Sequence, residues 1–265
     1  MSHAQTMTPR WALVLGASSG FGDACVRALS SAGYDIAGVH LDRKAGLQRV
    51  EDIKAAVEAA GQRSLFFNMN AADEDKRGEV IDALAGDIEV NGGTVAVLMH
   101  SLAFGTLKPY IGDDVLSKPN IQMTLDVMAH SLVYWAQDVA HRQLMGRGGR
   151  IFAMTSSGST RVINSYGAVS AAKCALESHT RQLALELAPM GITANALRGG
   201  VTNTPAARRI PGSDQLFELA ARRNPYGRLT TPEDVANAVV ALCNPGTDWM
   251  TGNVINVDGG EEITS

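Results

Sequence analysis

The stretch Gly16-Ala17-Ser18-Ser19-Gly20-Phe21-Gly22 directly follows a short apolar segment and opens a helical pattern. Glycines here allow a tight turn and let backbone amides approach a pyrophosphate, which the positive end of the helix dipole also favours. The spacing is GxxxGxG rather than GxGxxG, so the glycines alone would also suit an ordinary turn. Because the stretch lies between a first strand and a helix, we interpret it as a dinucleotide-binding loop that uses Gly16, Gly20 and Gly22.

Short apolar segments alternate with longer helical patterns along the whole chain. Several apolar segments show no polar alternation, as expected for strands of a parallel sheet that is covered on both faces. The alternation predicts an α/β fold: one Rossmann-type domain over residues 1–265, with a doubly wound, seven-stranded parallel sheet and helices on both faces. The expected strands are Trp11–Leu15, Asp35–His40, Ser64–Asn68, Thr94–Met99, Arg150–Met154, Thr193–Leu197 and Val254–Val257. The expected helices are Phe21–Ala32, Gly46–Ala60, Asp73–Ala85, Asn120–Met145, Ser165–Ala188, Ser213–Arg223 and Pro232–Cys243.

One connection, Thr204–Gly227, is long and contains a helical pattern of its own. Long connections of this kind often cover active sites, so we expect a lid-like substrate segment at about residues 204–227. Its apolar side chains suit either an acyl chain or packing against the sheet. These residues are Leu216, Phe217, Leu219 and Ala220.

The composition argues against two classes of partner. A formal net charge of −4 disfavours nucleic acid and anionic membranes, which both favour basic surfaces. No segment approaches the roughly 18 consecutive apolar residues that span a bilayer. Met1–Arg10 lacks the apolar run of a signal peptide, so we expect a cytoplasmic protein.

The three cysteines, Cys25, Cys174 and Cys243, are widely spaced and form no CxxC pair. Neither a disulfide framework nor a metal site is therefore expected. Each cysteine falls in a helical pattern, where we expect a small, buried apolar residue.

The end of the second expected strand bears on the choice of cofactor. It reads His40-Leu41-Asp42-Arg43-Lys44. The carboxylate of Asp42 can accept hydrogen bonds from ribose hydroxyls and would repel a 2′-phosphate, whereas Arg43 can pair with that phosphate. The cofactor is therefore expected to be NADH or NADPH, with NADH slightly favoured by Asp42.

Tyr166 and Lys173 are candidates for the chemical pair. They lie seven positions apart at the start of an amphipathic helical pattern, so both return to nearly the same face, roughly 10 Å apart along the axis. A nearby ammonium favours the phenolate, which would make Tyr166 a better proton donor and acceptor near neutral pH. A tyrosine and a lysine at this spacing are also common on helices that have no catalytic role. The prediction of a chemical pair therefore depends on the presence of the glycine-rich loop.

The chain resembles short-chain dehydrogenases/reductases from about residue 11 to residue 260. Most members of that superfamily carry Tyr-x3-Lys, but the fourth residue after Tyr166 is Ser170. The motifs that carry the resemblance are GASSGFG at Gly16–Gly22, Asn70-Ala71-Ala72-Asp73, NPYGR at Asn224–Arg228 and TGNVINVDGG at Thr251–Gly260.

Three features are instead similar to enoyl-acyl-carrier-protein reductases. The chemical pair has the spacing Tyr-x6-Lys, and the fourth expected strand ends in His100-Ser101-Leu102-Ala103-Phe104, which resembles His-Ser-x-x-Phe. Met128 stands where carbonyl reductases usually have a catalytic asparagine. The stretches Gly158–Leu187 and Asn195–Thr204 resemble the divergent enoyl reductases of bacilli.

The resemblance implies roles for individual residues. Tyr166 and Lys173 would be catalytic together with Ser156, which stands where many enoyl reductases have a second tyrosine. Ser156 would either hydrogen-bond the thioester oxygen or satisfy backbone groups at a strand end. His100, Ser101 and Leu102 would line the cofactor channel, and the turn after the sixth strand would fix the nicotinamide carboxamide. All residues implied or interpreted to bind the cofactor are Gly16, Ser18, Ser19, Gly20, Phe21, Gly22, Asp42, Arg43, Asn70, Ala71, His100, Ser101, Leu102, Lys173, Gly200, Val201, Thr202 and Thr204.

The resemblance further implies NAD(P)H-dependent reduction of the carbon–carbon double bond of a trans-2-enoyl thioester in fatty acid biosynthesis. The partners would be a small acyl thioester, free or on acyl carrier protein, and further copies of the chain in a homotetramer. Asn120–Met145 and Ser165–Ala188 would form the dimer interface, although their apolar stripes would also fit an intramolecular core.

Two alternatives remain open. A carbonyl reductase or alcohol dehydrogenase of the short-chain family, acting on a 3-oxoacyl or other ketone substrate, would keep the fold, but Met128 and the missing Tyr-x3-Lys count against it. A non-catalytic dinucleotide-binding sensor is disfavoured because Tyr166 and Lys173 are both present.

Overall fold

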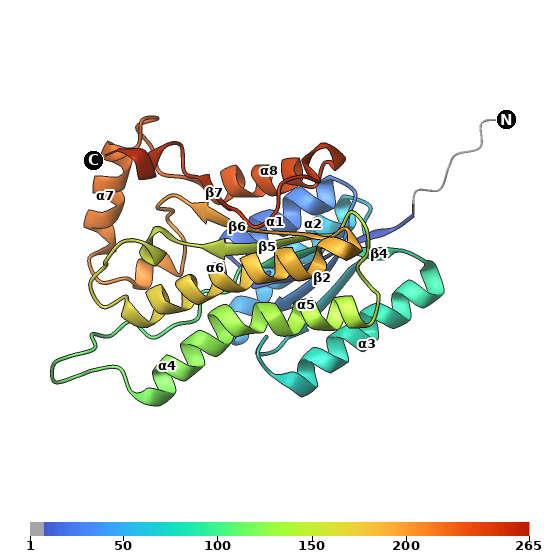
Figure 1. Cartoon of the computed structure of the whole chain (residues 1–265), viewed down its shortest axis with the longest axis horizontal. Helices are drawn as coiled ribbons and strands as arrows, with labels where there is room; N and C mark the ends of the chain where they lie inside the picture. The colour runs from blue at the N-terminus through green and yellow to red at the C-terminus, as the bar shows by residue number, and fades with distance from the viewer. Residues whose placement is uncertain (1–7, 265) are drawn as a thin grey trace.

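The computed structural model describes residues 8–264, and over that range it forms an α/β fold around one sheet (Figure 1). The strand order is β3-β2-β1-β4-β5-β6-β7 and every neighbouring pair is parallel, which confirms the predicted seven-stranded sheet. The strand order reverses between β1 and β4. Doubly wound sheets bind ligands beyond the carboxyl ends of the strands at such a reversal.

Each strand matches its expected range to within two residues. The strands are β1 (Arg10–Leu15), β2 (Asp35–His40), β3 (Ser64–Asn68), β4 (Thr94–His100), β5 (Arg150–Thr155), β6 (Thr193–Gly199) and β7 (Val254–Val257).

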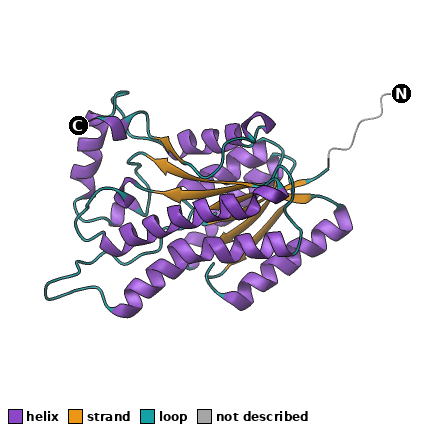
Figure 2. Ribbon diagram, in the orientation of Figure 1, coloured by secondary structure: helices purple, strands orange, loops and turns teal. Residues whose placement is uncertain are grey.

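Helices cover both faces of the sheet (Figure 2). Side chains of one strand point alternately to the two faces, so β1 contributes Leu13 and Leu15 to one core and Ala12 and Val14 to the other. The first core lies under α3, α4, α5 and α6, and the second lies under α1, α2 and α8. Over residues 8–264 the α-helices are α1 (Gly20–Ser31), α2 (Leu47–Ala59), α3 (Glu74–Asn91), α4 (Lys118–Leu125), α5 (Ser131–His141), α6 (Gly167–Leu187), α7 (Ser213–Arg223) and α8 (Pro232–Leu242).

The expected single helix Asn120–Met145 is wrong in two respects. A π-helical turn, η2 (Asp126–His130), separates α4 from α5, and the N–H of Ser131 bonds to the Asp126 carbonyl five residues back. α5 then ends because Gln143 has a φ of 56°, which a right-handed helix does not accommodate. The apolar pattern continues through both interruptions, so the sequence pattern alone predicted one helix.

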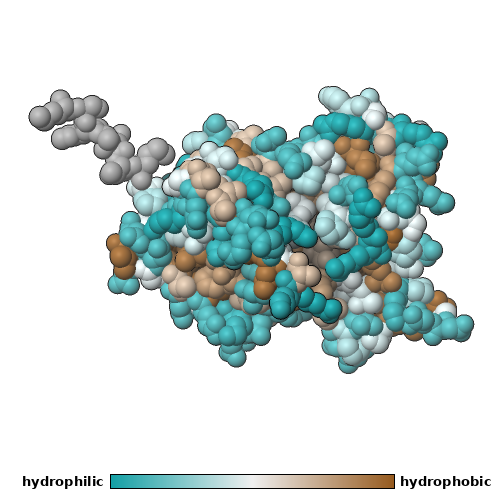
Figure 3. All heavy atoms as spheres, turned by 180° about the vertical axis from the view of Figure 1, so that it is seen from behind, coloured by the Kyte–Doolittle hydropathy of each residue, from teal (hydrophilic) through white to brown (hydrophobic). Residues whose placement is uncertain are grey.

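Hydrophilic side chains cover most of the side of the molecule opposite to that in Figure 1, and apolar residues occur there in separate groups (Figure 3). No helix within residues 8–264 is long and apolar enough to cross a membrane. The expectation for Met1–Arg10 lies mostly outside the described residues.

The cysteines differ in burial. Cys25 is buried in α1 as expected, Cys243 is half-buried just after α8, and Cys174 is exposed on α6. The expectation of a buried residue is therefore wrong for Cys174, because Lys173 before it occupies the inward face and the next position turns away from the sheet. Among the residues that the structure describes, no group of three or more His, Cys, Asp or Glu side chains is placed to hold a metal ion.

Trp135 links α5 to the loop after β3, because its indole N–H donates to the Ala71 carbonyl at 2.8 Å. The variant Trp135→Phe would retain most of the buried apolar volume but leave that carbonyl unpartnered. We expect it to lower the free energy of unfolding by about 1–3 kcal/mol, measured by urea denaturation. The control is Trp249→Phe, at a position that is 98% exposed. An equal loss in both variants would contradict a role for the indole hydrogen bond.

Candidate active site

The glycine-rich loop between β1 and α1 has no room for side chains at two positions. A Cβ on Gly16 would lie 2.3 Å from the Ser101 carbonyl oxygen, and a Cβ on Gly22 would lie 2.0 Å from the Gly16 carbonyl oxygen. Gly16 and Gly20 also have φ angles of 86° and 57°, which glycine adopts readily. The loop therefore lies tightly against the end of β4 before α1 begins at Gly20.

The N-terminus of α1 fits an anionic group. Its N-cap, Ser19, makes no side-chain capping hydrogen bond, so the first-turn amides next to the glycine-rich loop are open to a ligand. Uncapped first-turn amides and the helix dipole together attract a phosphate. The loop and this helix end therefore fit the pyrophosphate of a dinucleotide. The residues predicted there are Ser18, Ser19, Gly20 and Phe21.

Asp42 has a defined orientation beyond the end of β2. Its Oδ2 lies 3.0 Å from Nδ1 of His40, and its backbone N–H donates to Oδ1 of Asn68 at 3.0 Å. Arg43 follows it and is exposed. Both residues that bear on cofactor choice thus lie at the carboxyl edge of the sheet. The imidazole partner of Asp42 was missed, although His40 is the last residue of β2 and lies only two positions earlier.

Asn70 and Ala71 lie just beyond β3, next to the end of β2. Asn70 is exposed, and its Oδ1 accepts a hydrogen bond from the Ala72 N–H at 3.1 Å. Ala71 is buried and its carbonyl bonds to Trp135. Of the two residues predicted to contact adenine, only Asn70 has an exposed side chain.

Tyr166 is the N-cap of α6, which begins two residues later than expected. Its ring lies against Gly158, where a Cβ would be 2.5 Å from Cε1 of the ring. Ser165 before it has a φ of 58°, in the left-handed region that non-glycine residues rarely adopt. Strain of this kind persists only where the surroundings hold the backbone. The backbone position from which the Tyr166 side chain extends is therefore fixed.

Ser156 lies one residue beyond β5 and beside Tyr166. Its Oγ accepts the Gly158 N–H at 3.1 Å, so the strand-end role considered for it is present. Burial raises the pKa of Tyr166 above its usual value, and the Ser156 hydroxyl partly offsets that rise. The hydroxyl therefore also acts on the phenol.

The Lys173 ammonium is buried among backbone carbonyls. Its Nζ donates to the Met154 carbonyl at 2.7 Å and to the Leu102 carbonyl at 3.4 Å. Burial lowers the pKa of Lys173 to about 8, against an opposing effect of Glu177. The expectation that this ammonium favours the Tyr166 phenolate is wrong for this arrangement, because burial dominates and raises the pKa of the phenol.

Glu177 was missed, although it lies one helical turn after Lys173 on the same face, a spacing that brings side chains together. Its Oε1 accepts the Thr155 hydroxyl at 2.6 Å and lies 3.4 Å from Nη2 of Arg198. Arg198 also donates to Oγ of Ser159 at 3.1 Å. This network joins β5, α6, β6 and the loop beside Tyr166.

His100, predicted to line the cofactor channel, is the last residue of β4. Its side chain is completely buried, and its Nε2 lies 2.9 Å from Oγ of Ser131. Ser101 and Leu102 follow it beyond β4 and are half-buried. The Ser101 N–H donates to the Leu15 carbonyl at 2.9 Å, which joins the ends of β1 and β4.

A residue near the C-terminal end of the described chain holds the loop after β6: the Val201 N–H donates to Oε2 of Glu261 at 2.9 Å. Thr204 is buried, and its methyl carbon would lie 3.3 Å from a Cβ on Gly20. This loop therefore contacts the start of α1. Glu261 was missed because nothing in its local pattern indicates a partner 60 residues away. The predicted residues of the loop are Gly200, Val201, Thr202 and Thr204.

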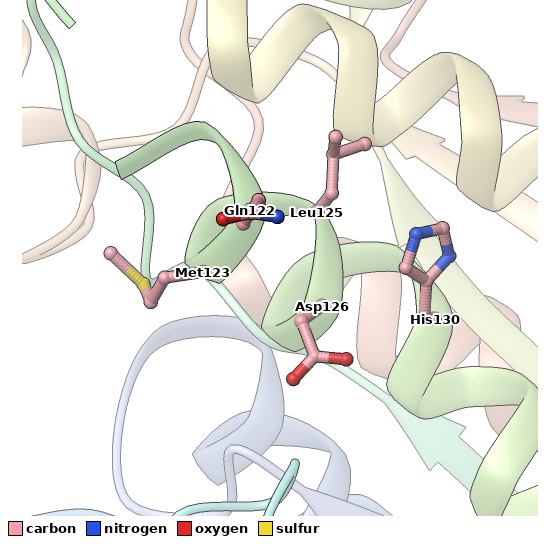
Figure 4. Close-up of a pocket in the computed structure, with 5 residues that line it drawn as sticks. All are labelled: Gln122, Met123, Leu125, Asp126 and His130. Atoms are coloured by element: carbon pink, nitrogen blue, oxygen red, sulfur yellow. The ribbon is translucent and has the colours of Figure 1, made fainter. Parts of the chain in front are cut away.

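Two hollows lie near these elements. One of about 200 Å³ lies where α1, the loop after β6 and the start of α8 meet, and it includes Gly20 and Thr204. The other, of about 410 Å³, lies on α4 and η2, and none of its residues belongs to the predicted site (Figure 4). Its lining residues are Gln122, Met123, Leu125, Asp126 and His130.

The expected lid, Thr204–Gly227, contains α7 and lies at the end of the molecule where the strands have their carboxyl ends (Figure 1). Leu216 and Phe217 are half-buried and Ala220 is buried. Leu219 is 55% exposed. The apolar surface of α7 is thus only partly used in packing against the rest of the described chain.

A family model described as Enoyl-(Acyl carrier protein) reductase matches residues 16–262. The chain belongs to this family of short-chain dehydrogenases/reductases. It is therefore a member of an oxidoreductase family, and its glycine-rich loop, Tyr166 and Lys173 all fall within the matched range.

Individual relatives carry names of more than one reaction. The chain is 32% identical over 186 residues to the NADH-dependent enoyl-[acyl-carrier-protein] reductase FabI of Aquifex aeolicus, covering 70% of this chain and 68% of that protein. It is 29% identical over 261 residues to an NADPH-dependent aldehyde reductase-like protein of Arabidopsis thaliana, covering 95% and 93%. The crystal structure of FabI from Candidatus Liberibacter asiaticus matches with a TM-score of 0.85 and 26% identity, over 97% of this chain and 96% of that one.

Gly158→Ala would put a methyl group against the Tyr166 ring and displace the phenol. We expect the rate of reduced-cofactor oxidation to fall by about 100-fold, since small misplacements of a reacting group have effects of that size. The matched control is Gly78→Ala, where a Cβ would meet nothing within 4 Å. Thermal unfolding of both variants checks the fold, and an unchanged rate in Gly158→Ala would contradict this placement of the phenol.

Proposed function

We propose that the protein reduces the carbon–carbon double bond of a trans-2-enoyl thioester with NADH. The observation that carries the proposal is the Tyr166 phenol at the start of α6 and the buried Lys173 ammonium on the same helix, six residues between them. The uncapped N-terminus of α1 supports a dinucleotide beside this pair. The family of the chain and its identity with FabI of Aquifex aeolicus support reduction of an enoyl substrate.

Nicotinamide, when bound, supplies the hydride, which the β-carbon of the substrate accepts. Negative charge then develops on the thioester oxygen of the substrate as an enolate, and a proton from solvent that adds to the α-carbon completes the saturated thioester. Because burial raises the pKa of Tyr166, the phenol stays protonated near neutral pH and can donate a hydrogen bond to that oxygen. The Ser156 oxygen accepts the Gly158 N–H, so the hydroxyl proton of Ser156 can be donated to the same oxygen.

Lys173 has three N–H donors, of which two are directed to the Met154 and Leu102 carbonyls. The third can donate to a hydroxyl of the nicotinamide ribose. In this role the ammonium orients the cofactor and leaves proton donation to Tyr166.

NADH is the proposed cofactor. The imidazole of His40 orients the Asp42 carboxylate, which can accept ribose hydroxyls and would repel a 2′-phosphate. The FabI proteins of Aquifex aeolicus and Bacillus cereus are both named as NADH enzymes, which supports the same choice here. Arg43 is exposed beside Asp42 and is the residue that would pair with NADPH.

The thioester is proposed to enter beneath α7, carried on coenzyme A or acyl carrier protein. The lid-like segment, residues 204–227, contains four arginines and two acidic residues, in a chain of net charge −4. The phosphate groups of either carrier would be attracted to this basic segment. The homotetramer with an interface on Asn120–Met145 and Ser165–Ala188, and the cytoplasmic location, stay predictions.

Carbonyl reduction is the second candidate. It is favoured by the likeness to the aldehyde reductase-like protein of Arabidopsis thaliana, which extends over 95% of this chain. Against it, Ser170 takes the position of the usual lysine and donates to the Gly158 carbonyl at 2.5 Å. Met128, at the position of the usual asparagine, is buried and apolar.

Cofactor oxidation with crotonyl-CoA and acetoacetyl-CoA, each tried with NADH and NADPH, tests the proposal. We expect crotonyl-CoA with NADH to be at least about tenfold faster than the other combinations. Tyr166→Phe should lower that rate by about 10²–10³, because it removes the proposed donor to the developing negative charge. Oxidation with acetoacetyl-CoA alone would favour carbonyl reduction. Tight NADH binding without turnover would favour a sensor.

The pH dependence of kcat/KM tests the role of Lys173. We expect activity to fall above about pH 8, because burial lowers the pKa of Lys173 to about 8 and the neutral amine loses its attraction for the ribose hydroxyls. Lys173→Arg should have a flat alkaline limb at whatever activity it retains, since a guanidinium stays charged there. An alkaline decline that persists in Lys173→Arg would assign the decline to another group.

A further inference from the structure

His100 is a buried titratable residue that the proposed reaction does not use. Its side chain is completely buried, and Nδ1 has no hydrogen-bond partner among the described residues. Buried polar atoms nearly always have a partner, so this nitrogen requires a physical explanation.

The π-helical turn η2 determines which nitrogen of His100 carries the proton. The Ser131 N–H bonds to the Asp126 carbonyl, and the Ser131 hydroxyl donates to the Val127 carbonyl at 2.7 Å. With its proton directed there, the Ser131 oxygen accepts from Nε2 of His100, 2.9 Å away. Nε2 therefore carries the proton, and Nδ1 has an unshared lone pair.

The backbone of His100 lies beside the carbonyls that hold the Lys173 ammonium. It pairs with Ala153 across β4 and β5. The two carbonyls that Lys173 contacts follow at once: Met154 comes directly after Ala153, and Leu102 comes two residues after His100. Burial and this ammonium together lower the pKa of His100 to about 3, against an opposing effect of the backbone carbonyls of His100 and Val127, so the ring is neutral at physiological pH.

We propose that His100 is a positioning residue: its unprotonated Nδ1 faces the Lys173 ammonium and stabilises the charged form of that group. The importance of this charge for turnover rests on the proposed role of Lys173 at the cofactor ribose. A nitrogen lone pair is a partial negative charge, and its effect on a cation is large where water is excluded. The opposite tautomer would turn an N–H towards the ammonium and destabilise it.

The proposed effect of His100 on the charge of Lys173 can be distinguished from the effects of the other nearby groups. Glu177 on α6 raises the pKa of Lys173, but Arg198 on β6 lies 3.4 Å from the same carboxylate and shares its charge. Tyr166 on α6 is neutral, because burial raises its pKa. Met128 on η2 is apolar and buried. From the end of β4 the Leu102 carbonyl accepts from this ammonium at 3.4 Å, and the proposal adds the lone pair of the His100 ring to it.

Two substitutions separate this role from a purely structural link between β4 and α5. The amide oxygen of His100→Asn can occupy the place of Nδ1, but the shorter side chain loses the contact with Ser131. The amide of His100→Gln reaches Ser131 but leaves no acceptor at the place of Nδ1. A lone-pair effect predicts that His100→Asn resembles the wild type, whereas a structural link predicts that His100→Gln does.

The charge of Lys173 is followed by NMR on protein labelled with ¹³C at lysine Cε, with its signal assigned by loss in Lys173→Met. We expect the midpoint of its titration to fall by about one pH unit in His100→Gln, a tenfold loss of proton affinity, and to stay at the wild-type value in His100→Asn. The alkaline limb of kcat/KM should move with it. Equal midpoints in all three proteins, a fall in His100→Asn alone, or an equal fall in both variants would overturn the proposal. The NMR titration needs no substrate, so it remains decisive even if the proposed reaction is wrong.

A second measurement uses the wild-type protein and does not depend on the stability of the variants. The ¹⁵N chemical shifts of the His100 ring report which nitrogen is protonated. We expect a protonated Nε2 and an unprotonated Nδ1 throughout the neutral range. A protonated Nδ1 would overturn the proposal.

Discussion

The arrangement of residues at the carboxyl edge of this sheet depends on one buried charge, the ammonium group of Lys173. A charge removed from water is destabilising by several kcal/mol unless hydrogen bonds and an opposite charge offset it. For Lys173 the offset comes from the Met154 and Leu102 carbonyls and from Glu177 one turn along the helix. Those carbonyls belong to residues at the ends of β5 and β4, so the position of the ammonium depends on the register between these strands. The parallel sheet, buried on both faces, fixes that register.

The loops at the same edge are held to one another by close contacts. Gly16 lies against the Ser101 carbonyl, Thr204 packs on Gly20, and the backbone of Val201 is bound by Glu261 near the end of the described chain. Segments far apart in the sequence therefore have fixed positions around the start of α6. The phenol, the ammonium and the uncapped end of α1 form one arrangement because of these contacts.

The strands were predictable because their apolar segments are short, unbroken and bounded by turn residues, and the glycine-rich loop was predictable from its place between β1 and α1. The π-helical turn at Asp126–His130 was not, since buried apolar residues run through it from α4 into α5 without a turn residue between them. The raised pKa of Tyr166 could not be inferred either, because burial is set by tertiary packing rather than by spacing from Lys173. Glu177 and His40 lay within reach of sequence reasoning, as each stands at a regular spacing from a residue already singled out.

Enoyl and carbonyl reduction differ in the atom of the substrate to which hydride is added, and the family of this chain includes relatives named for each kind of substrate. The most direct measurement supplies NADH deuterated at the transferred position to a mixture of crotonyl-CoA and acetoacetyl-CoA and locates the label by mass spectrometry and NMR. We expect one deuterium at the β-carbon of butyryl-CoA. Unchanged crotonyl-CoA together with deuterium on the carbinol carbon of 3-hydroxybutyryl-CoA would contradict the chemistry proposed for Tyr166 and Lys173.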